Sequence, residues 1–120
     1  MRVSCAVVIR DNKILIQKRY RKGRFVFEFP MGRVEEGESF QEAAIRELKE
    51  ETSLDGTFKS LEVLQNKLGD KIAFVTLSIS DTAIPLSDEN RKQEYFWFKW
   101  KDIPLEDFHE LDREFIQGKI

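Results

Sequence analysis

A run of acidic residues carries the chemistry that this sequence suggests most strongly. Seven glutamates lie between Glu35 and Glu51, and the stretch from Glu38 to Thr52 has the apolar periodicity of an α-helix. The plain interpretation is a solvated acidic helix face. On such a face Arg46 would pair with the glutamates four residues before and after it, Glu42 and Glu50.

Helix geometry favours a different interpretation of three of these glutamates. At roughly 100° per residue, Glu51 falls within the apolar stripe that includes Phe40 and Leu48. Glu47 lies at the edge of this stripe, and Glu50 lies on the same flank. Carboxylates in such positions repel one another and resist burial unless a positive charge lies among them. Because all-oxygen ligands favour Mg²⁺ or Mn²⁺ over zinc, the segment predicts a divalent metal site.

The spacing of these residues resembles the Nudix box of the MutT-like Nudix hydrolases. That box reads Gly-x5-Glu-x7-Arg-Glu-U-x-Glu-Glu-x-Gly-U, where U is aliphatic, and the matching segment here runs from Gly32 to Leu54. The resemblance extends to the opening strands, to the Phe-Glu-Phe-Pro segment before the box, and to the aromatic strand and terminal helix after it. The chain departs at Ser53, in place of the last glycine, and at Met31, in place of the first of a glycine pair. We expect the box glycine to end the helix in a left-handed conformation, where a serine costs about 1 kcal/mol.

The resemblance implies hydrolysis of a nucleoside diphosphate linked to another moiety, with Mg²⁺ (or Mn²⁺) as the cofactor. It also implies a role for each matching residue. The expected metal ligands are Glu50, Glu51, the backbone carbonyl of Met31 and Glu47, although Glu47 could instead be the general base. Arg46 would orient Glu47, and Gly32 and Glu38 would support the site. Glu94 would be a further ligand or base.

Two further segments are candidates for contacts with the substrate. Five cations lie between Lys18 and Arg24, which is typical either of a solvated loop or of a phosphate-binding segment. In the resemblance Arg19 matches a phosphate contact, and Arg24 belongs to the same cluster. Asp112, near the start of the terminal helix, loosely matches a residue that reads a purine edge. The alternative for Asp112 is an acid that stabilises the helix N-terminus.

The substrate class is predicted from the same resemblance. We expect a MutT-like enzyme that releases pyrophosphate from a (d)NTP, with oxidised purine nucleotides among the candidate substrates. Dinucleoside polyphosphate and nucleotide-sugar hydrolases are the enzymatic alternative. A proline or tyrosine downstream of the box marks these two classes, and the corresponding segment here, Asp70 to Ile72, contains neither. A non-catalytic nucleotide-sensing module is the other alternative, but such modules usually lack box carboxylates that this chain retains.

The elements that would position these residues are mainly strands. We expect strands at Val3–Ile9 and Ile14–Ile16 joined as a hairpin, at Phe25–Phe29, Thr57–Leu64 and Ile72–Ile79, and at the aromatic stretch Tyr95–Trp100. Residues 32–37 are expected to form a loop. Ser39 and Glu42 form a capping box at the start of the central helix, and a second helix covers Leu111–Gln117. The pattern predicts an α+β fold with a mixed or antiparallel sheet, which the resemblance specifies as an α/β/α sandwich.

Composition limits the remaining possibilities. The chain has 120 residues, which is typical of one domain (1–120), and 41% of them are hydrophobic. With 20 basic and 22 acidic residues it is not a general nucleic-acid coat protein, so no stable nucleic-acid partner is expected. The single cysteine, Cys5, excludes an intrachain disulfide and is expected to be a small buried residue. No membrane segment is apparent, and we expect a cytoplasmic monomer or homodimer acting on a nucleotide.

Overall fold

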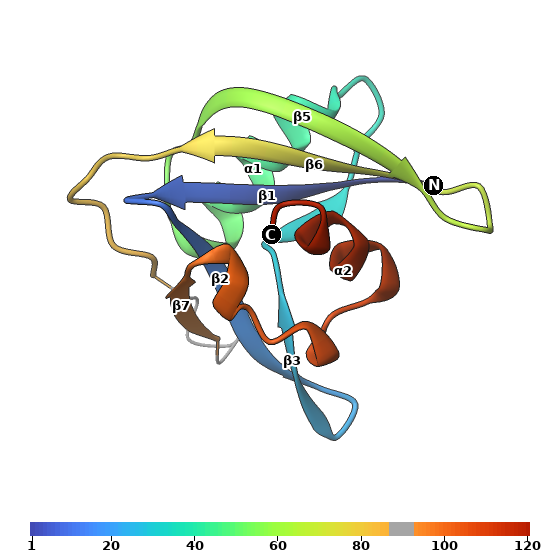
Figure 1. Ribbon diagram of the computed structural model, residues 1–120. Helices are drawn as coiled ribbons and strands as arrows, with labels where there is room; N and C mark the ends of the chain where they lie inside the picture. Colours follow the sequence, from blue (N-terminus) through green and yellow to red (C-terminus); the bar gives the residue numbers. More distant parts are fainter. Residues whose placement is uncertain (87–92) are drawn as a thin grey trace.

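The computed structural model describes residues 1–86 and 93–120 (Figure 1). The sheet in these residues is mixed, because β1 and β6 are parallel while the other pairs are antiparallel. The described elements are β1 (Arg2–Arg10), β2 (Lys13–Arg21), β3 (Arg24–Glu28), β4 (Met31–Arg33), α1 (Phe40–Thr52), β5 (Thr57–Gln65), β6 (Lys71–Ser78), β7 (Glu94–Phe98), two 3₁₀ turns (Trp100–Asp102 and Leu105–Asp107) and α2 (Glu110–Gln117).

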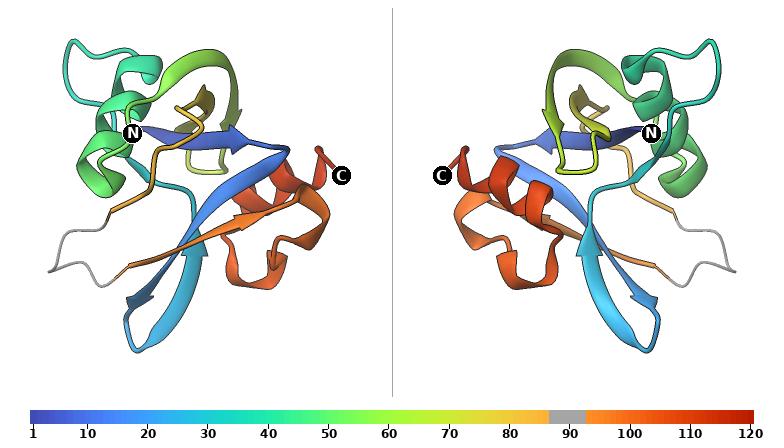
Figure 2. Two further views of the ribbon diagram at one scale, coloured as in Figure 1. Left: turned by 90° about the vertical axis from the view of Figure 1, so that its left-hand side faces the viewer. Right: turned by 90° about the vertical axis from the view of Figure 1, so that its right-hand side faces the viewer.

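The strands form one sheet whose main order is β3-β2-β1-β6-β5. In addition, β4 pairs with the first half of β1, and β7 pairs with β2. The two helices lie on opposite sides of this sheet, as the edge-on views in Figure 2 show. The predicted α+β class and the sandwich arrangement are therefore confirmed.

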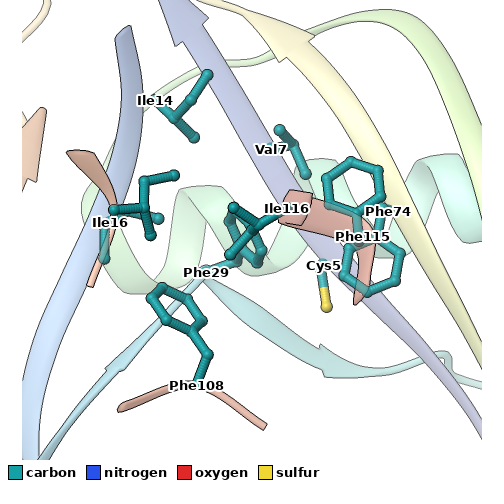
Figure 3. Packing of buried hydrophobic residues seen from close by; sticks show 10 residues of the cluster. Cys5, Val7, Ile14, Ile16, Phe29, Phe74, Phe108, Phe115 and Ile116 are labelled. Atoms are coloured by element: carbon teal, nitrogen blue, oxygen red, sulfur yellow. The ribbon is translucent and has the colours of Figure 1, made fainter. Parts of the chain in front are cut away.

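Two apolar cores hold the layers together. One lies between the sheet and α1 and includes Leu15, Leu48 and Val75. The other lies between the sheet and α2 and is rich in aromatic rings (Figure 3). In this second core Phe74 and Phe115 stack with their ring centroids 4.2 Å apart. The fold thus fixes α1 against the sheet by apolar contacts on one face, and its polar face remains available for chemistry.

The start of α1 agrees with its sequence pattern. Ser39 is the N-cap, and it exchanges hydrogen bonds with Glu42 in a complete capping box. Glu42 is thereby held at the helix start, where it does not pair with Arg46. Of the two pairs in the plain interpretation of the helix, the structure contains only the one between Arg46 and Glu50.

Two predicted segments differ from the structure. The second strand does not end at Ile16 but continues to Arg21, so most of the cation-rich stretch belongs to a β-hairpin rather than a loop. Cross-strand pairing with β3 explains this extension, because it provides hydrogen-bond partners for the backbone NH and carbonyl groups of these residues. Their side chains are mostly polar and do not show the apolar pattern of a strand. The segment predicted as a loop begins instead with the short strand β4, which pairs with β1 through Met31 and Gly32.

Replacing Ser53 with glycine is expected to stabilise the protein. Ser53 ends α1 with φ of 64°, so the expected left-handed conformation at this position is confirmed. An L-residue with a β-carbon is strained there and glycine is not. We expect Ser53→Gly to raise the free energy of unfolding by about 0.5–1 kcal/mol, measured by urea denaturation. A variant less stable than wild type would contradict this account of the helix end.

Among the described residues, none of the helices has both the length and the apolar character needed to cross a membrane.

Candidate active site

The glutamates of α1 differ in burial as their positions on the helix predict. Glu51 is 2% exposed and packs within the core. The side chain of Glu47 is 15% exposed and that of Glu50 is 55% exposed. The three carboxylates therefore extend from the core to the surface along one flank of the helix. Burial of a carboxylate is costly unless it is paired, so the partners of each one decide what the site can do.

Arg46 is the centre of the charged network on this flank. Its guanidinium forms a bidentate pair with Glu38, with nitrogen–oxygen distances of 2.7 and 2.9 Å. It also donates to Glu47 Oε1 at 2.8 Å and to Glu50 Oε2 at 3.3 Å. A further bond, to the carbonyl oxygen of Arg33, ties the helix to the end of β4. Arg46 thus holds Glu47 in place and links it to the preceding loop.

The pairing with Arg46 keeps Glu38 ionised. Hydrogen bonds from Arg46 lower the pKa of Glu38 to about 2, and the backbone NH of Glu35 assists. The same contacts, chiefly those of Glu38, raise the pKa of Arg46 above its ordinary value. Because the pKa of Glu38 is lowered on folding, this pair stabilises the protein fully when the pH is above the ordinary carboxyl pKa. The stabilisation is lost as the pH falls toward 2.

Gly32 forms a cradle for the carboxylate of Glu47. A β-carbon placed on Gly32 would collide with the carboxylate carbon and with Oε1 of Glu47. Glycine at this position therefore allows the backbone of β4 to lie directly against the acid of α1. The first and the middle parts of the box are brought together by this contact, although fifteen positions separate them in the sequence.

A buried amide joins the third glutamate to the sheet. Gln17 Nε2 on β2 donates to Glu51 Oε1 and to Glu28 Oε1, both at 3.1 Å. The hydroxyl of Tyr95 donates to the backbone carbonyl of Glu51 at 2.6 Å. Glu28 is itself 2.8 Å from the guanidinium Nε of Arg19. The carboxylate on the helix is thus connected through β2 and β3 to the arginine predicted to bind phosphate.

Gln17 and Glu28 are site residues that the sequence analysis did not identify. Both are buried polar residues on strands, and each occupies a position where strand alternation would place an apolar side chain. Glu28 lies between two phenylalanines, and this acid in an aromatic strand was the available signal. Its partners Gln17 and Arg19 could not be predicted, because they lie on a different strand, β2.

Asp112 lies deep in the protein rather than on the surface of α2. It is 4% exposed, and its Oδ2 has no hydrogen-bond partner in residues 1–86 and 93–120. Burial raises the pKa of Asp112 to about 7, and the charge of Glu28 contributes. Burial also raises the pKa of the Cys5 thiol, as do the charges of Asp112, Glu28 and Glu51. The expected burial of Cys5 is confirmed. Asp112 lies in the first turn of α2, as the helix N-terminus alternative requires, but it is buried there.

Replacing Asp112 with asparagine is expected to flatten the pH dependence of stability. Because the pKa of Asp112 rises from 3.8 to about 7 on folding, wild type loses stability as the pH rises between these values. A pKa difference of this size corresponds to a loss of about 4 kcal/mol in the free energy of unfolding. Asp112→Asn has no carboxyl group to ionise at this position and therefore avoids that loss. Urea denaturation of both proteins at pH 4.5 and pH 8 should show the variant gaining on wild type at the higher pH. Parallel curves would contradict the burial of an ionisable group here.

The donor set on α1 suits a hard divalent cation. As the side chains lie, Glu47 and Glu50 face Arg46 while Glu51 faces Gln17, and no three acids, histidines or cysteines in the described ranges surround a single point. The residues nonetheless fit a magnesium ion by chemistry, because they supply only carboxylate oxygens. The cradle at Gly32 brings Glu47 against the backbone next to Met31, whose carbonyl is the predicted additional ligand.

Glu94 and Arg24 lie apart from this cluster. Glu94 begins β7, is exposed, and pairs in register with Lys18 on β2. Side chains alternate along a strand, so Glu94 points to the opposite side from its neighbour Tyr95, which contacts Glu51. Arg24 begins β3 at the tip of the hairpin and is exposed. The structure therefore groups five of the predicted residues, Gly32, Glu38, Arg46, Glu47 and Glu50, directly, and joins Glu51 and Arg19 through Gln17 and Glu28.

Comparison with protein families and curated sequences gives consistent results. A family model described as NUDIX domain matches residues 1–118. RNA pyrophosphohydrolase from Pelagibacter ubique is 33% identical over 96 residues, which cover 80% of this chain and 57% of that protein. ADP-ribose pyrophosphatase from Methanocaldococcus jannaschii is 46% identical over 56 residues, covering 46% of this chain and 33% of that protein. The chain thus spans between a third and somewhat over half of the length of these relatives.

Solved structures share the same fold. The solution structure of the E. coli ORF135 protein matches with a TM-score of 0.78 and 24% identity, covering 98% of this chain and 86% of that one. A structure from work on MutT of Aliivibrio salmonicida and Vibrio cholerae matches with a TM-score of 0.78 and 23% identity, covering 98% and 92%. At such identities the likeness concerns the arrangement of helices and strands.

Proposed function

Because the chain belongs to the Nudix family, we propose that it is a metal-dependent pyrophosphohydrolase acting on a nucleoside triphosphate. The products are a (d)NMP and pyrophosphate, and oxidised purine nucleotides are among the candidate substrates. The observation that carries this proposal is the cradle in which Gly32 receives Glu47 while Arg46 holds the same carboxylate. Such an arrangement positions an acid beside a backbone that can approach a phosphate closely.

Each residue of the site has a role in this proposal. Glu47, Glu50, Glu51 and the carbonyl of Met31 would hold the metal. A bound Mg²⁺ would neutralise the charge of the pyrophosphate oxygens and favour attack at phosphorus. Water adds to phosphorus, the anhydride P–O bond breaks, and a carboxylate accepts the proton of the water. Glu47 is the candidate for this base that lies within the cluster, whereas the predicted alternative Glu94 lies apart from it.

Arg19 is the proposed phosphate ligand, and its replacement tests that role. Its ion pair with Glu28 holds the guanidinium beside the carboxylate cluster. A charged hydrogen bond contributes about 1.5–3 kcal/mol, so Arg19→Ala should raise KM for a triphosphate roughly tenfold or more. The variant also removes a partner of Glu28, so its folding is checked by circular dichroism. A folded variant whose KM equals that of wild type would contradict phosphate binding by Arg19, which would then serve only as the ion-pair partner of Glu28.

Asp112 is the proposed reader of the base. Its Oδ2, buried and without a hydrogen-bond partner among the described residues, suits a ligand that brings a donor. An ionised carboxylate only accepts hydrogen bonds, which suits N1–H and the 2-amino group of guanine. A protonated one can also donate to the ring nitrogen of adenine. Guanine, or its oxidised form, is therefore the favoured base when Asp112 is ionised.

A second substrate class is supported by the names of the relatives. One is named for RNA and the other for ADP-ribose, and both names describe cleavage of a pyrophosphate linkage. A nucleotide-sugar or dinucleoside polyphosphate substrate therefore remains the alternative to a (d)NTP.

A nucleotide panel distinguishes these functions. The protein is incubated with Mg²⁺ and each (d)NTP, 8-oxo-dGTP, a dinucleoside polyphosphate or ADP-ribose, and the products are separated by ion-exchange chromatography. We expect the largest kcat/KM for a (d)NTP with pyrophosphate as product. A higher value for ADP-ribose or the dinucleoside polyphosphate would replace the proposed substrate. Nucleotide binding without any turnover would instead identify a sensing module.

A further inference from the structure

A cavity with a largely cationic lining lies at the tip of the β2–β3 hairpin, away from the glutamates. Its volume is about 140 Å³, which exceeds what a single water molecule requires. Figure 2 shows the hairpin projecting from the body of the sheet. The residues that line this cavity, which we call the tip pocket, are Arg21, Lys22, Arg24, Val26 and His109. Three of these five side chains are cations, although the chain as a whole has a net charge of −2.

The positions of the cations in the tip pocket are unfavourable for the stability of the hairpin itself. Arg21 and Arg24 are direct cross-strand partners, and like charges in that relation destabilise a hairpin. Lys22 occupies the first position of the two-residue turn with φ of 49°, where Asn, Asp or Gly is favoured. Arg21 comes within 3.9 Å of Glu28, but Lys22 and Arg24 form no salt bridge with a carboxylate in the parts of the chain that the structure describes. The pocket therefore has excess positive charge, which an anion would compensate.

The tip pocket lies on the same face of the hairpin as two residues of the candidate active site, Gln17 and Glu28. The pairs Gln17–Glu28 and Arg21–Arg24 are both in register and lie an even number of residues apart on each strand. Their side chains consequently share one face of the hairpin. Gln17 lies on this face where it contacts Glu51, so a ligand following the face would pass from the glutamates to the arginines.

The length of the hairpin indicates which part of a ligand reaches the tip pocket. Arg19, which lies opposite Val26, is the proposed ligand of the phosphates that are cleaved. Two residues of strand take the chain from Arg19 to Arg21 of the tip pocket, which corresponds to about 7 Å at 3.3 Å per residue. A phosphate in the tip pocket therefore belongs to a more distant part of the substrate than the reacting pyrophosphate.

We propose that the tip pocket binds a phosphate group that the substrate carries beyond its first nucleoside. This inference rests on the proposed function and narrows its substrate class to nucleotides extended by a further phosphate. The chemistry fits either the phosphodiester of a 5′-triphosphorylated oligonucleotide or a 3′-phosphate on a mononucleotide. Arginine is suited to both, because its planar fork binds phosphate oxygens in pairs.

Kinetics with matched substrates test the proposal. We compare kcat/KM for a nucleoside triphosphate, its 3′-phosphorylated form and a 5′-triphosphorylated dinucleotide. Wild type should prefer at least one extended substrate roughly tenfold, and the preferred one identifies the phosphate source. Arg24→Ala and Arg21→Ala should each remove most of this preference, lowering kcat/KM for the extended substrate more than for the simple one. Equal rates for all three substrates in wild type would overturn the proposal.

The matched control is Lys18→Ala on the opposite face of the same hairpin. Lys18 pairs in register with Phe27, and its ammonium lies 4.6 Å from the ring centroid of Phe25. A general effect of charge would lower the preference in this variant as much as in Arg24→Ala, and that result would contradict a specific pocket.

A binding experiment separates failure of this proposal from failure of the proposed function. If no substrate is hydrolysed, the proposed function fails, and the dissociation constant of a fluorescent 5′-triphosphorylated dinucleotide is measured by anisotropy. Binding that weakens at least tenfold in Arg24→Ala, but not in Lys18→Ala, would support the tip pocket. Equal binding by wild type and both variants would overturn it.

Discussion

Replacing Glu51 with glutamine is expected to abolish turnover and leave the protein folded. The substitution keeps the shape of the side chain, and the new amide oxygen can still accept the hydrogen bond from Gln17. It removes one charge from a buried region that also contains Glu28, so stability should not fall. The lost metal ligand is expected to lower kcat by about 10³-fold or more, since metal catalysis contributes several kcal/mol.

The control for this variant is Glu36→Gln. Glu36 lies in the exposed loop before α1, so its replacement changes the net charge equally without touching the cluster. Both variants are assayed with Mg²⁺, and their folding is compared by near-UV circular dichroism. Undiminished turnover in Glu51→Gln would contradict the assigned role, as would an equal loss in both variants.

Replacing Gly32 with alanine is the second change expected to have a large effect. The backbone of Gly32 does not have positive φ, so alanine is tolerated there conformationally. The added methyl group would, however, collide with the carboxylate of Glu47. That carboxylate is the far end of a flexible side chain and can move aside, so folding should survive. A displacement of about 1 Å at a reacting group can cost 10²-fold, and we expect a loss of about this size in kcat.

Gly118→Ala is a suitable control for the glycine replacement. A β-carbon at Gly118 would lie 3.4 Å from the nearest carbonyl oxygen, that of Phe115, and far less crowded than at Gly32. Steady-state kinetics and thermal denaturation are measured for both variants. An alanine at position 32 with wild-type kcat would show that the position of Glu47 does not matter for the reaction.

The site was predictable where its signal is local in the sequence. The capping box at Ser39 and the burial of Glu51 both follow from residues within a few turns of one helix, and both are confirmed. The left-handed conformation of Ser53 is likewise determined by the helix end itself. Spacing along a helix fixes direction, so such features can be read without knowledge of the rest of the fold.

Features that depend on contacts between distant segments were not predictable. The choice of Glu38 over Glu42 as the partner of Arg46 follows from how the loop after β4 folds back on the helix. The continuation of β2 to Arg21 depends on pairing with β3, which the cation-rich sequence does not reveal. The burial of Asp112 depends on how α2 packs on the sheet. The contacts that decide these three features form only in the tertiary structure, and they override the local preferences of the sequence.

The central claim is that the glutamates of α1 hold the divalent cation that hydrolysis requires. Titration with Mn²⁺, followed by the electron paramagnetic resonance signal of the free ion, tests it most directly. Wild type and Glu36→Gln should bind Mn²⁺ with equal affinity, and added Mg²⁺ should release it. In Glu51→Gln the dissociation constant should rise at least tenfold. Equal Mn²⁺ affinity in wild type and Glu51→Gln would contradict the claim.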